Sequence, residues 1–249
     1  MKCILLENTK LNDNYYLLKF DRSNIHEEIV PGQFVTVKLP QERAGQRLGI
    51  PLSIYQADAT SFTLFVKILG EGTRILAQAE VNQELDILAP LGKGFTLVEN
   101  KTVLLISGGV GYPPLKFLKD KLLNCKVIWI HGGKTASDIF PCDFPCTEDG
   151  TTGIKGLVTT NLETILQANK IDMAYSCGPN AMMKAVYKIL KQHDIPYEVS
   201  LEEYMACGIG VCYGCAVQVV SLDEKPLYKR VCKEGPVFKA EEIVWEKSK

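Results

Sequence analysis

Four cysteines near the carboxyl end have the most distinctive spacing in the chain. Cys207, Cys212 and Cys215 form a Cys-x4-Cys-x2-Cys pattern, and Cys232 follows farther along. This is the spacing of plant-type [2Fe–2S] centres, in which one looping segment supplies three thiolates and a distant position supplies the fourth. In a reducing compartment, such a cysteine cluster indicates metal or redox chemistry rather than disulfide bonds.

The residues between these cysteines suit a backbone that wraps around a metal centre. Gly208, Gly210 and Gly214 permit close approach and positive φ angles, so that free N–H groups can donate to sulfur. Four cysteines also bind zinc tetrahedrally, but zinc ribbons usually carry two Cys-x2-Cys knuckles and this chain has one such pair. The spacing therefore favours a [2Fe–2S] cluster over zinc and over four buried structural cysteines.

Length and composition limit the remaining choices. The chain has 249 residues, of which 46% are hydrophobic and 23% charged, and its net charge is −1. This length exceeds the usual single-domain mode of about 100–150 residues and favours two domains. The balanced charge lacks the basic footprint of nucleic-acid binding, and no apolar run approaches the roughly 18–20 residues of a bilayer helix. With no signal peptide at its start, the sequence predicts a cytoplasmic protein without nucleic-acid or membrane partners.

The first hundred residues predict an antiparallel β-barrel or sandwich. Short β-prone runs alternate with turn clusters, and one helical patch, at 73–79, interrupts them. The predicted strands are Tyr15–Phe20, Phe34–Lys38, Leu52–Tyr55, Phe62–Ile68 and Glu84–Leu88. We expect this barrel domain to span residues 1–98.

The next hundred residues predict a parallel sheet flanked by helices. Continuous apolar runs at Thr102–Ser107 and Val127–Ile130 are typical of strands buried on both faces, and a helical pattern at Pro113–Leu123 joins them. Further helices are expected at 162–168 and 180–192, a strand ends at Ser176, and residues 140–156 resemble a loop. We expect this α/β domain to span residues 99–202 and a cluster-binding segment to span residues 203–249, which is too short to fold without a metal or a host domain.

Two glycine-containing turns follow predicted strands of the α/β domain. The first contains Gly108, Gly109 and Gly111, and the second is Cys177–Gly178–Pro179. Neither is a Rossmann Gly-x-Gly-x-x-Gly motif, and each alone could be merely a tight turn, with Cys177 a small core residue. Because ligands bind at the carboxyl ends of parallel strands, two such turns facing one crevice favour a dinucleotide site.

Two segments of the barrel domain also stand out. Ile50–Pro51–Leu52–Ser53 precedes a tyrosine and, by itself, reads as an edge strand with a proline. Lys67 precedes Gly70, Gly72 and Thr73, which lie at a helix start suited to phosphate. Neither segment identifies a flavin without further information.

Together these motifs resemble one family over nearly the whole chain. A barrel, a pyridine-nucleotide domain and a [2Fe–2S] segment follow in the order of the ferredoxin–NADP reductase superfamily. Within it, the chain is most similar to the electron-transfer subunits of class 1B dihydroorotate dehydrogenase. The segments that carry the resemblance are Met205–Cys215, Gly108–Pro114, Ala89–Phe95 and Cys177–Pro179.

The resemblance implies an oxidoreductase subunit of pyrimidine biosynthesis that binds FAD and a [2Fe–2S] cluster and uses NAD(H) as substrate. Its implied partner is an FMN-containing dihydroorotate dehydrogenase catalytic subunit. The implied flavin contacts are Pro51, Leu52, Ser53, Lys67, Gly72 and Thr73, with the last three at the ribityl-diphosphate. The implied nicotinamide contacts are Gly108, Gly109, Gly111, Cys177, Gly178 and Pro179. The implied metal ligands are Cys207, Cys212, Cys215 and Cys232.

One position departs from the family pattern. The family places arginine before the proline of its flavin motif, whereas this chain has Ile50, and Arg47 is the nearest candidate to replace that guanidinium. Two alternatives therefore stay open: a divergent NAD(P)H reductase module for another acceptor, such as a hydrogenase or a ferredoxin-dependent enzyme, and a scaffold subunit without flavin. No acid–base or nucleophilic catalytic residue is expected, because the cofactors carry the electron chemistry. Cys3, Cys125, Cys142 and Cys146 have no assigned role.

Overall fold

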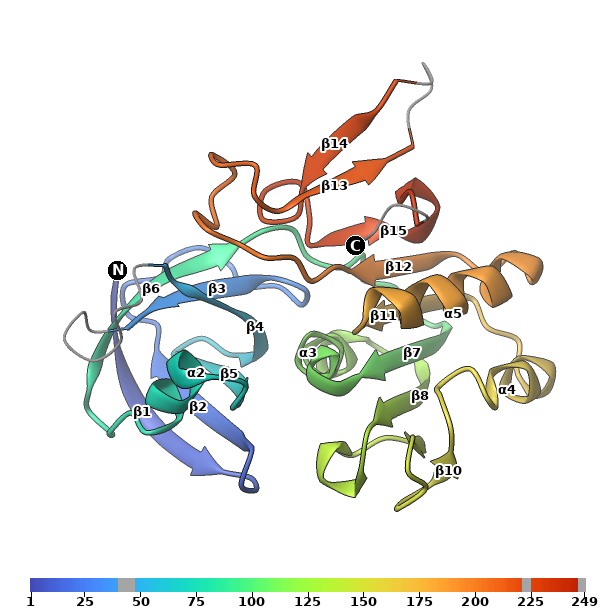
Figure 1. Ribbon diagram of the computed structural model, residues 1–249, viewed down its shortest axis with the longest axis horizontal. Helices are drawn as coiled ribbons and strands as arrows, with labels where there is room; N and C mark the ends of the chain where they lie inside the picture. The colour runs from blue at the N-terminus through green and yellow to red at the C-terminus, as the bar shows by residue number, and fades with distance from the viewer. Residues whose placement is uncertain (40–47, 221–224, 246–249) are drawn as a thin grey trace.

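The computed structural model describes residues 1–39, 48–220 and 225–245, and it places a β-barrel beside a mainly parallel sheet (Figure 1). The barrel is closed and antiparallel, in the order β1-β2-β5-β4-β3-β6. Its strands are β1 (Lys2–Lys10), β2 (Tyr15–Asp21), β3 (Phe34–Lys38), β4 (Ile50–Ala57), β5 (Ser61–Lys67) and β6 (Glu84–Leu91), with helix α2 (Glu71–Ala77) between the last two. The predicted barrel is confirmed, and β1 is a strand that the sequence prediction did not include.

The second sheet has seven strands in the order β10-β9-β8-β7-β11-β12-β15. All neighbours are parallel except β12 and β15. Its central strands are β7 (Thr102–Gly108), β8 (Lys126–Gly133), β11 (Met173–Cys177) and β12 (Tyr197–Ser200), and its helices are α3 (Tyr112–Lys121), α4 (Leu162–Ala168) and α5 (Asn180–Gln192). Burial of Val103–Ile106 on both faces explains the continuous apolar run that predicted β7.

The prediction of a loop over residues 140–156 is wrong in part. β9 (Phe144–Thr147) and β10 (Ile154–Lys155) extend the sheet beyond β8 in parallel register. These strands are short, and Pro145 within β9 obscures the pattern. β10 is the edge strand and pairs with β9 only at Cys146 and Thr147, so Pro145 lies just outside that ladder, where a proline is tolerated.

The carboxyl-terminal segment packs onto the α/β part and does not form a core of its own. β13 (Ala216–Val219) and β14 (Leu227–Arg230) pair as a hairpin, and β15 (Val237–Lys239) adds an antiparallel edge strand to β12. Val219, Val231, Phe238 and Trp245 belong to the same apolar cluster as residues of β11 and α5. The segment thus packs against a host, while its need for one stays a prediction.

No helix among the described residues is long and apolar enough to cross a membrane.

Candidate functional site

Three of the predicted metal ligands lie in the loop that precedes β13, and the fourth, Cys232, follows β14; the hairpin of β13 and β14 lies above the barrel in Figure 1. Backbone N–H groups donate to the sulfurs of all four. Val211 and Cys212 donate to Cys207 Sγ at 3.4 and 3.5 Å, and Gly214 donates to Cys212 Sγ at 3.4 Å. Gly210 donates to Cys232 Sγ at 3.1 Å, and Cys232 donates to Cys215 Sγ at 3.4 Å. N–H groups aimed at sulfur stabilise thiolates and cluster sulfurs alike.

The surroundings of the four thiols differ. The backbone N–H of Cys212, followed by that of Ile209, lowers the pKa of Cys207 to about 6. Burial, followed by the neighbouring Cys215, raises the pKa of Cys232 to about 12. Cys215 and Cys232 are buried, whereas Cys212 is exposed. The loop therefore has an inner pair of sulfurs and an outer edge open to the surface.

The sulfurs are arranged as pairs. The Sγ atoms of Cys215 and Cys232 lie 3.2 Å apart, and Cys207 is joined to Cys212 through a backbone hydrogen bond. In residues 1–39, 48–220 and 225–245, no three Cys, His, Asp or Glu side chains converge as ligands of a single ion. Two pairs of thiols fit a two-iron core, in which four cysteines share two metal ions, better than one tetrahedral zinc.

The glycines of this loop act in two different ways. Gly208 and Gly210 have φ angles of +70° and +82°, as predicted, but Gly214 does not have a positive φ, and Tyr213 has one of +59° instead. A Cβ atom on Gly214 would contact only Cys212 Sγ, at 3.5 Å. At Gly214, therefore, neither the backbone conformation nor a lack of space for a Cβ atom requires glycine.

The cluster loop lies directly against the barrel. A Cβ atom at Gly208 would lie 2.9 Å from Thr36 Cγ2 on β3, so only glycine permits this approach. Thr36 pairs with Pro51 on β4. The loop that carries the predicted metal ligands is therefore one strand away from the predicted flavin contacts.

The two glycine-containing turns meet at the carboxyl edge of the parallel sheet. β7 and β11 are adjacent, with Ser107 paired to Cys177. A Cβ atom at Gly111 would lie 2.1 Å from the carbonyl oxygen of Cys177. Likewise, a Cβ atom at Gly178 would lie 3.0 Å from the backbone nitrogen of Gly108. The structure brings together the two predicted turns, and a Cβ atom has no room at Gly108, Gly111 or Gly178, whereas Gly109 faces open space.

Polar groups surround the second turn. The thiol of Cys177 is buried and donates weakly to Glu202 Oε1 at 3.9 Å. Burial, followed by the nearby carboxylate of Glu202, raises the pKa of Cys177 well above its usual value. Asn180 Oδ1, at the start of α5, is buried and has no hydrogen-bond partner among the described residues. This turn therefore combines a thiol that stays protonated with a buried amide oxygen that could accept a hydrogen bond.

The predicted flavin contacts lie on a strand segment with one open side. β4 pairs with β3 over Ile50–Ser53, but it pairs with β5 only from Ile54 onward. Pro51 is exposed, and Leu52 and Ser53 are half-buried. The alternative of an edge strand is wrong, because β4 is an inner strand of the closed barrel. Proline is tolerated at a position where the ladder is already interrupted.

The side chains at the positions predicted to hold the flavin phosphates are not free to bind a ligand in this structure. Lys67 Nζ lies 2.8 Å from Asp138 Oδ1, and Thr73 Oγ1 accepts from the N–H groups of Leu69 and Gly70. Ile50 is buried in the barrel core and offers no ligand. Gly72 stays in the first turn of α2, and Arg47 lies outside the described residues. The structure thus supports the flavin edge at Pro51–Ser53 more strongly than the phosphate contacts.

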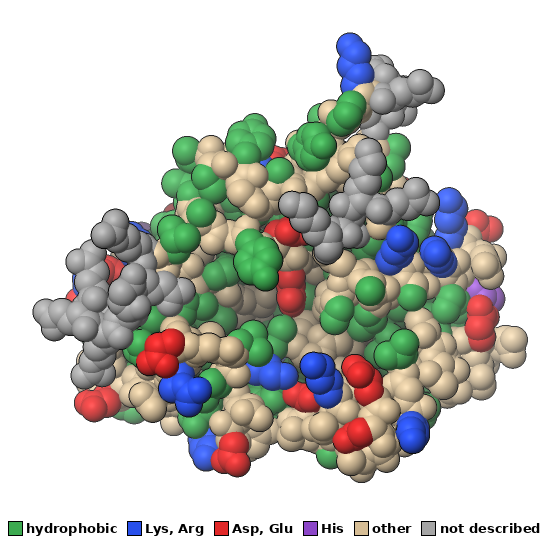
Figure 2. All heavy atoms as spheres, in the orientation of Figure 1, with side chains coloured by type: hydrophobic (Ala, Val, Ile, Leu, Met, Phe, Trp, Pro, Cys, Tyr) green, Lys and Arg blue, Asp and Glu red, His purple; other side chains and the backbone are tan. Residues whose placement is uncertain are grey.

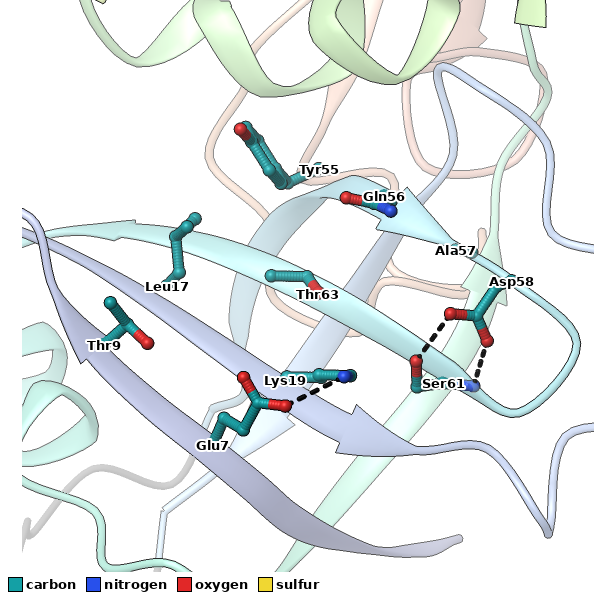
Figure 3. A pocket seen from close by; sticks show the side chains of 10 residues that line it. All are labelled: Glu7, Thr9, Leu17, Lys19, Tyr55, Gln56, Ala57, Asp58, Ser61 and Thr63. Atoms are coloured by element: carbon teal, nitrogen blue, oxygen red, sulfur yellow. Dashed lines mark hydrogen bonds and ion pairs between the residues drawn. The ribbon is translucent and has the colours of Figure 1, made fainter. Parts of the chain in front are cut away.

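Two recesses elsewhere contain none of the predicted site residues. One, of about 220 Å³, lies on the barrel wall, where Lys19 pairs with Glu7 and Asp58 accepts from Ser61 (Figure 3). The other, of about 400 Å³, lies by the start of β12 and includes Tyr187, Lys191 and Glu241. In the first recess, the charged groups already have partners.

The sequence did not reveal two residues that contact the predicted site. Thr36 is the barrel contact of the cluster loop, and Asp138 is the partner of Lys67. Both act through contacts between residues far apart in the chain, so no local motif could reveal them. The proximity of the cluster loop to β3 is visible only in the folded chain.

Comparison with known sequences agrees with this geometry. Residues 202–244 match the iron-sulfur cluster binding domain of dihydroorotate dehydrogenase B. The chain is 37% identical to the dihydroorotate dehydrogenase B (NAD(+)) electron transfer subunit of Desulforamulus reducens, with 94% of each chain covered. It is 36% identical to the subunit of the same name from Caldanaerobacter subterraneus subsp. tengcongensis, with 98% of each covered.

Solved structures show the same architecture. The structure of an NADH-dependent reduced ferredoxin-NADP oxidoreductase, studied for flavin-based electron bifurcation, matches 98% of this chain and 90% of its own with a TM-score of 0.83 and 26% identity. A ferredoxin NADP+ reductase from Neisseria gonorrhoeae with bound FAD and NADP matches 77% of this chain and 90% of its own, with a TM-score of 0.63. At 16% identity, the latter likeness concerns the fold alone.

Proposed function

We propose a function that follows from the family of the chain: it belongs to the electron transfer subunits of dihydroorotate dehydrogenase B, and it passes electrons between NAD(H) and a dihydroorotate dehydrogenase catalytic subunit through FAD and a [2Fe–2S] cluster. The observation that carries this proposal is the contact of Gly208 with Thr36. It puts the cysteine loop beside the strand that pairs with Pro51. A flavin edge and a cluster loop are thereby neighbours within one chain.

The order of cofactors has a chemical reason. A flavin held at Pro51, Leu52 and Ser53 would supply the link between two-electron hydride chemistry with NADH and the one-electron chemistry of a cluster held by the four cysteines. The protein needs no acid or nucleophile for this; its residues bind, orient and exclude water. We assign FAD to residues 1–98, the nicotinamide nucleotide to residues 99–202 and the cluster to residues 203–249.

The nicotinamide end of this path is the pair of glycine turns. Gly108, Gly109 and Gly111 on one turn and Cys177–Pro179 on the other form its walls. Their close approach leaves backbone groups, rather than bulky side chains, at the carboxyl edge of the sheet. We assign the nicotinamide to this edge, facing the open side of β4.

The exit end is the exposed side of the cluster loop. Several large apolar side chains are exposed on either side of Cys212 in the sequence and on β14, and apolar side chains gather over the upper part of the face in Figure 2. They include Ile209, Val211, Tyr213 and Tyr228, and Val211 is 72% exposed. Exposed apolar groups of this kind mark protein interaction sites. We assign this patch to the binding of the catalytic subunit, since a partner that docks there comes nearest to the exposed sulfur of Cys212.

Reconstitution with the FMN-bearing catalytic subunit tests the exit assignment. Val211→Glu places a charge in the patch and is expected to weaken assembly at least tenfold, measured by titration calorimetry. Val81→Glu changes a similarly exposed valine far from the cluster loop along the chain and serves as the matched control, with assembly unchanged. Equal weakening in both variants, or in neither, would contradict the assignment.

A single ligand replacement tests the path. Cys212→Ser removes the outermost sulfur, so NADH should still reduce the flavin while orotate reduction by the complex stops. Loss of flavin reduction with the cluster intact would reverse the assigned order.

A second candidate has specific support. The likeness to the NADH-dependent reduced ferredoxin-NADP oxidoreductase extends over 98% of this chain. The chain could therefore serve a different one-electron acceptor with the same internal path. Electron delivery to ferredoxin, but not to the dihydroorotate dehydrogenase subunit, would favour this candidate.

A further inference from the structure

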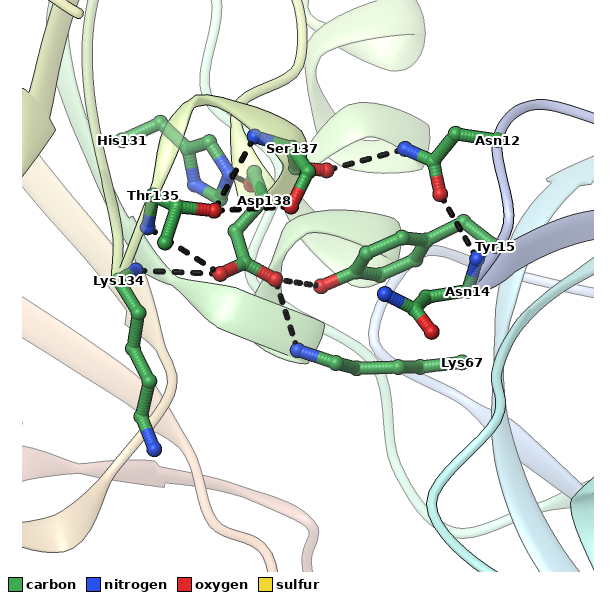
Figure 4. A network of polar contacts seen from close by, with 9 residues as sticks. All are labelled: Asn12, Asn14, Tyr15, Lys67, His131, Lys134, Thr135, Ser137 and Asp138. Atoms are coloured by element: carbon green, nitrogen blue, oxygen red, sulfur yellow. Dashed lines mark hydrogen bonds and ion pairs between the residues drawn. The ribbon is translucent and has the colours of Figure 1, made fainter. Parts of the chain in front are cut away.

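A buried carboxylate joins the barrel to the α/β part of the molecule. Asp138 ends the short 3-10 turn at Ala136–Asp138, and it is only 7% exposed. From the barrel, Tyr15 OH donates to Asp138 Oδ1 at 2.6 Å, and Lys67 Nζ lies 2.8 Å from the same oxygen (Figure 4). Burial alone would raise the pKa of Asp138, but the hydrogen bonds from Lys67 and Tyr15 hold it below its usual value. The carboxylate is therefore charged and held from both sides.

The α/β part supplies the remaining partners of this carboxylate. The backbone N–H groups of Lys134 and Thr135 donate to Asp138 Oδ2 at 3.2 and 3.4 Å. Beside it, the amide of Asn12 in the barrel donates to the carbonyl of Ser137 at 3.0 Å. Both oxygens of Asp138 are thus occupied, one by each part of the molecule.

The contacts continue from Asp138 to the first glycine turn. His131 Nε2 lies 2.9 Å from the carbonyl oxygen of Asp138, and His131 Nδ1 lies 2.8 Å from Ser107 Oγ. A carbonyl only accepts, so Nε2 carries the proton and Nδ1 accepts from the Ser107 hydroxyl. Trp129 Nε1 donates to Ser107 Oγ at 2.9 Å. Burial lowers the pKa of His131 to about 4, which keeps the ring neutral and this single pattern intact.

We propose that Tyr15, Lys67 and Asp138 form an interdomain tie that, through His131 and Ser107, positions the nicotinamide turn relative to the flavin edge of the barrel. Lys67 then belongs to this tie rather than to the flavin diphosphate. The proposal rests on the proposed function, since it concerns the alignment of its two cofactors. All five residues are positioning residues, because none is assigned a contact with the reacting atoms.

Three features carry the proposal. The tie crosses between segments 71 and 123 residues apart in sequence, so it fixes the two parts against each other. It ends at Ser107, which directly precedes Gly108 of the nicotinamide turn. It is also buried, where a charged pair is rigid and the loss of one partner leaves the other uncompensated.

The test separates alignment from binding. In the FAD-loaded protein, Asp138→Asn and Lys67→Met are expected to slow flavin reduction by bound NADH about tenfold, since misplaced reactants lose rate steeply. The dissociation constant of NADH is expected to stay within about twofold, because both glycine turns belong to the α/β part. FAD content is expected to stay equal to that of the wild type. Lys67→Arg keeps the ion pair and should restore most of the rate.

Lys19→Met is the matched control, because Lys19 pairs with Glu7 at 2.9 Å within the barrel and crosses no interface. It should leave the rate unchanged. Loss of FAD in Lys67→Met, with FAD retained in Asp138→Asn, would overturn the proposal and return Lys67 to the diphosphate. Unchanged flavin reduction in both variants would overturn it as well. Wild-type protein without FAD would instead contradict the proposed function, so the two failures are distinguishable.

Discussion

The cluster loop and the paired glycine turns both depend on glycine, and two physical causes are divided differently between them. In the cluster loop, Gly208 and Gly210 adopt positive φ angles, which turns backbone N–H groups toward sulfur, and Gly208 also lies too close to Thr36 for a Cβ atom. In the paired turns, Gly109 and Gly178 have positive φ angles, but Gly111 does not and is required because the backbone of Cys177 lies where a Cβ atom would be. Glycine is therefore required by backbone direction at some positions and by space at others. Substitution at each glycine should separate the two.

The largest effect is expected at the paired turns. Gly111→Ala would put Cβ 2.1 Å from the carbonyl oxygen of Cys177, and neither backbone can yield easily. We expect a loss of about 3 kcal/mol or more in the free energy of unfolding, together with loss of NADH binding. Urea denaturation and NADH titration measure the two. A variant of wild-type stability would show that the turns do not hold each other in place.

The α/β part contains a buried histidine, His131, that makes its stability depend on pH. His131 has a folded-state pKa of about 4 against a usual 6.5, so the unfolded chain takes up a proton first as the pH falls. Its contribution is fully present above about pH 6.5 and is lost progressively toward pH 4, by about 3 kcal/mol in total.

Urea denaturation of wild type and His131→Gln at pH 7 and pH 4.5 checks this expectation. The variant should lose less stability between the two pH values than the wild type does. Asp138, whose pKa is lowered, adds a loss in the same direction to both proteins, so the difference belongs to His131. Equal pH dependence in the two proteins would show that His131 is not held neutral by burial.

Within the cluster loop, two glycines form a matched pair. Gly208→Ala and Gly210→Ala share the cost of a positive φ, about 1 kcal/mol, and each adds a close contact, since Cβ at 208 would lie 2.9 Å from Thr36 Cγ2 and Cβ at 210 would lie 2.8 Å from Lys233 Cβ. We expect both variants to be destabilised to a similar extent, but only Gly208→Ala to disturb the contact with the barrel and so to slow electron transfer to the cluster.

Removal of the Thr36 methyl group tests the cause. Thr36→Ser should recover stability and the rate of cluster reduction in the Gly208→Ala background, because it removes Cγ2, but not in the Gly210→Ala background. If Thr36→Ser had the same effect in both backgrounds, measured by denaturation and by the rate of cluster reduction, the contact between the loop and the barrel would not be the cause.

The smallest effect is expected at Gly214. Its φ is not positive, and a Cβ atom there would meet Cys212 Sγ at an ordinary 3.5 Å. Gly214→Ala should change the free energy of unfolding by less than about 0.5 kcal/mol. A loss as large as that at Gly208 would mean that its backbone conformation matters after all.

The sequence allowed prediction of the barrel, the parallel sheet and the grouping of Cys207 with Cys212 and Cys215, because these depend on local patterns. It did not reveal β9 and β10 at the end of the sheet, because both strands are short and β9 contains a proline. It also did not reveal that Lys67 pairs with Asp138, which is 71 residues away. Contacts of this kind arise from packing between the two parts, and no motif encodes them.

The central claim is that one chain holds a flavin and a [2Fe–2S] cluster as neighbours on a path from NADH. The most direct measurement is FAD and iron content on one freshly purified sample, followed by anaerobic addition of NADH under visible and electron paramagnetic resonance spectroscopy. We expect about one FAD and two irons per chain, and we expect NADH to reduce both the flavin and the cluster. Colourless protein with stoichiometric zinc, or iron that NADH cannot reduce in the presence of FAD, would contradict it.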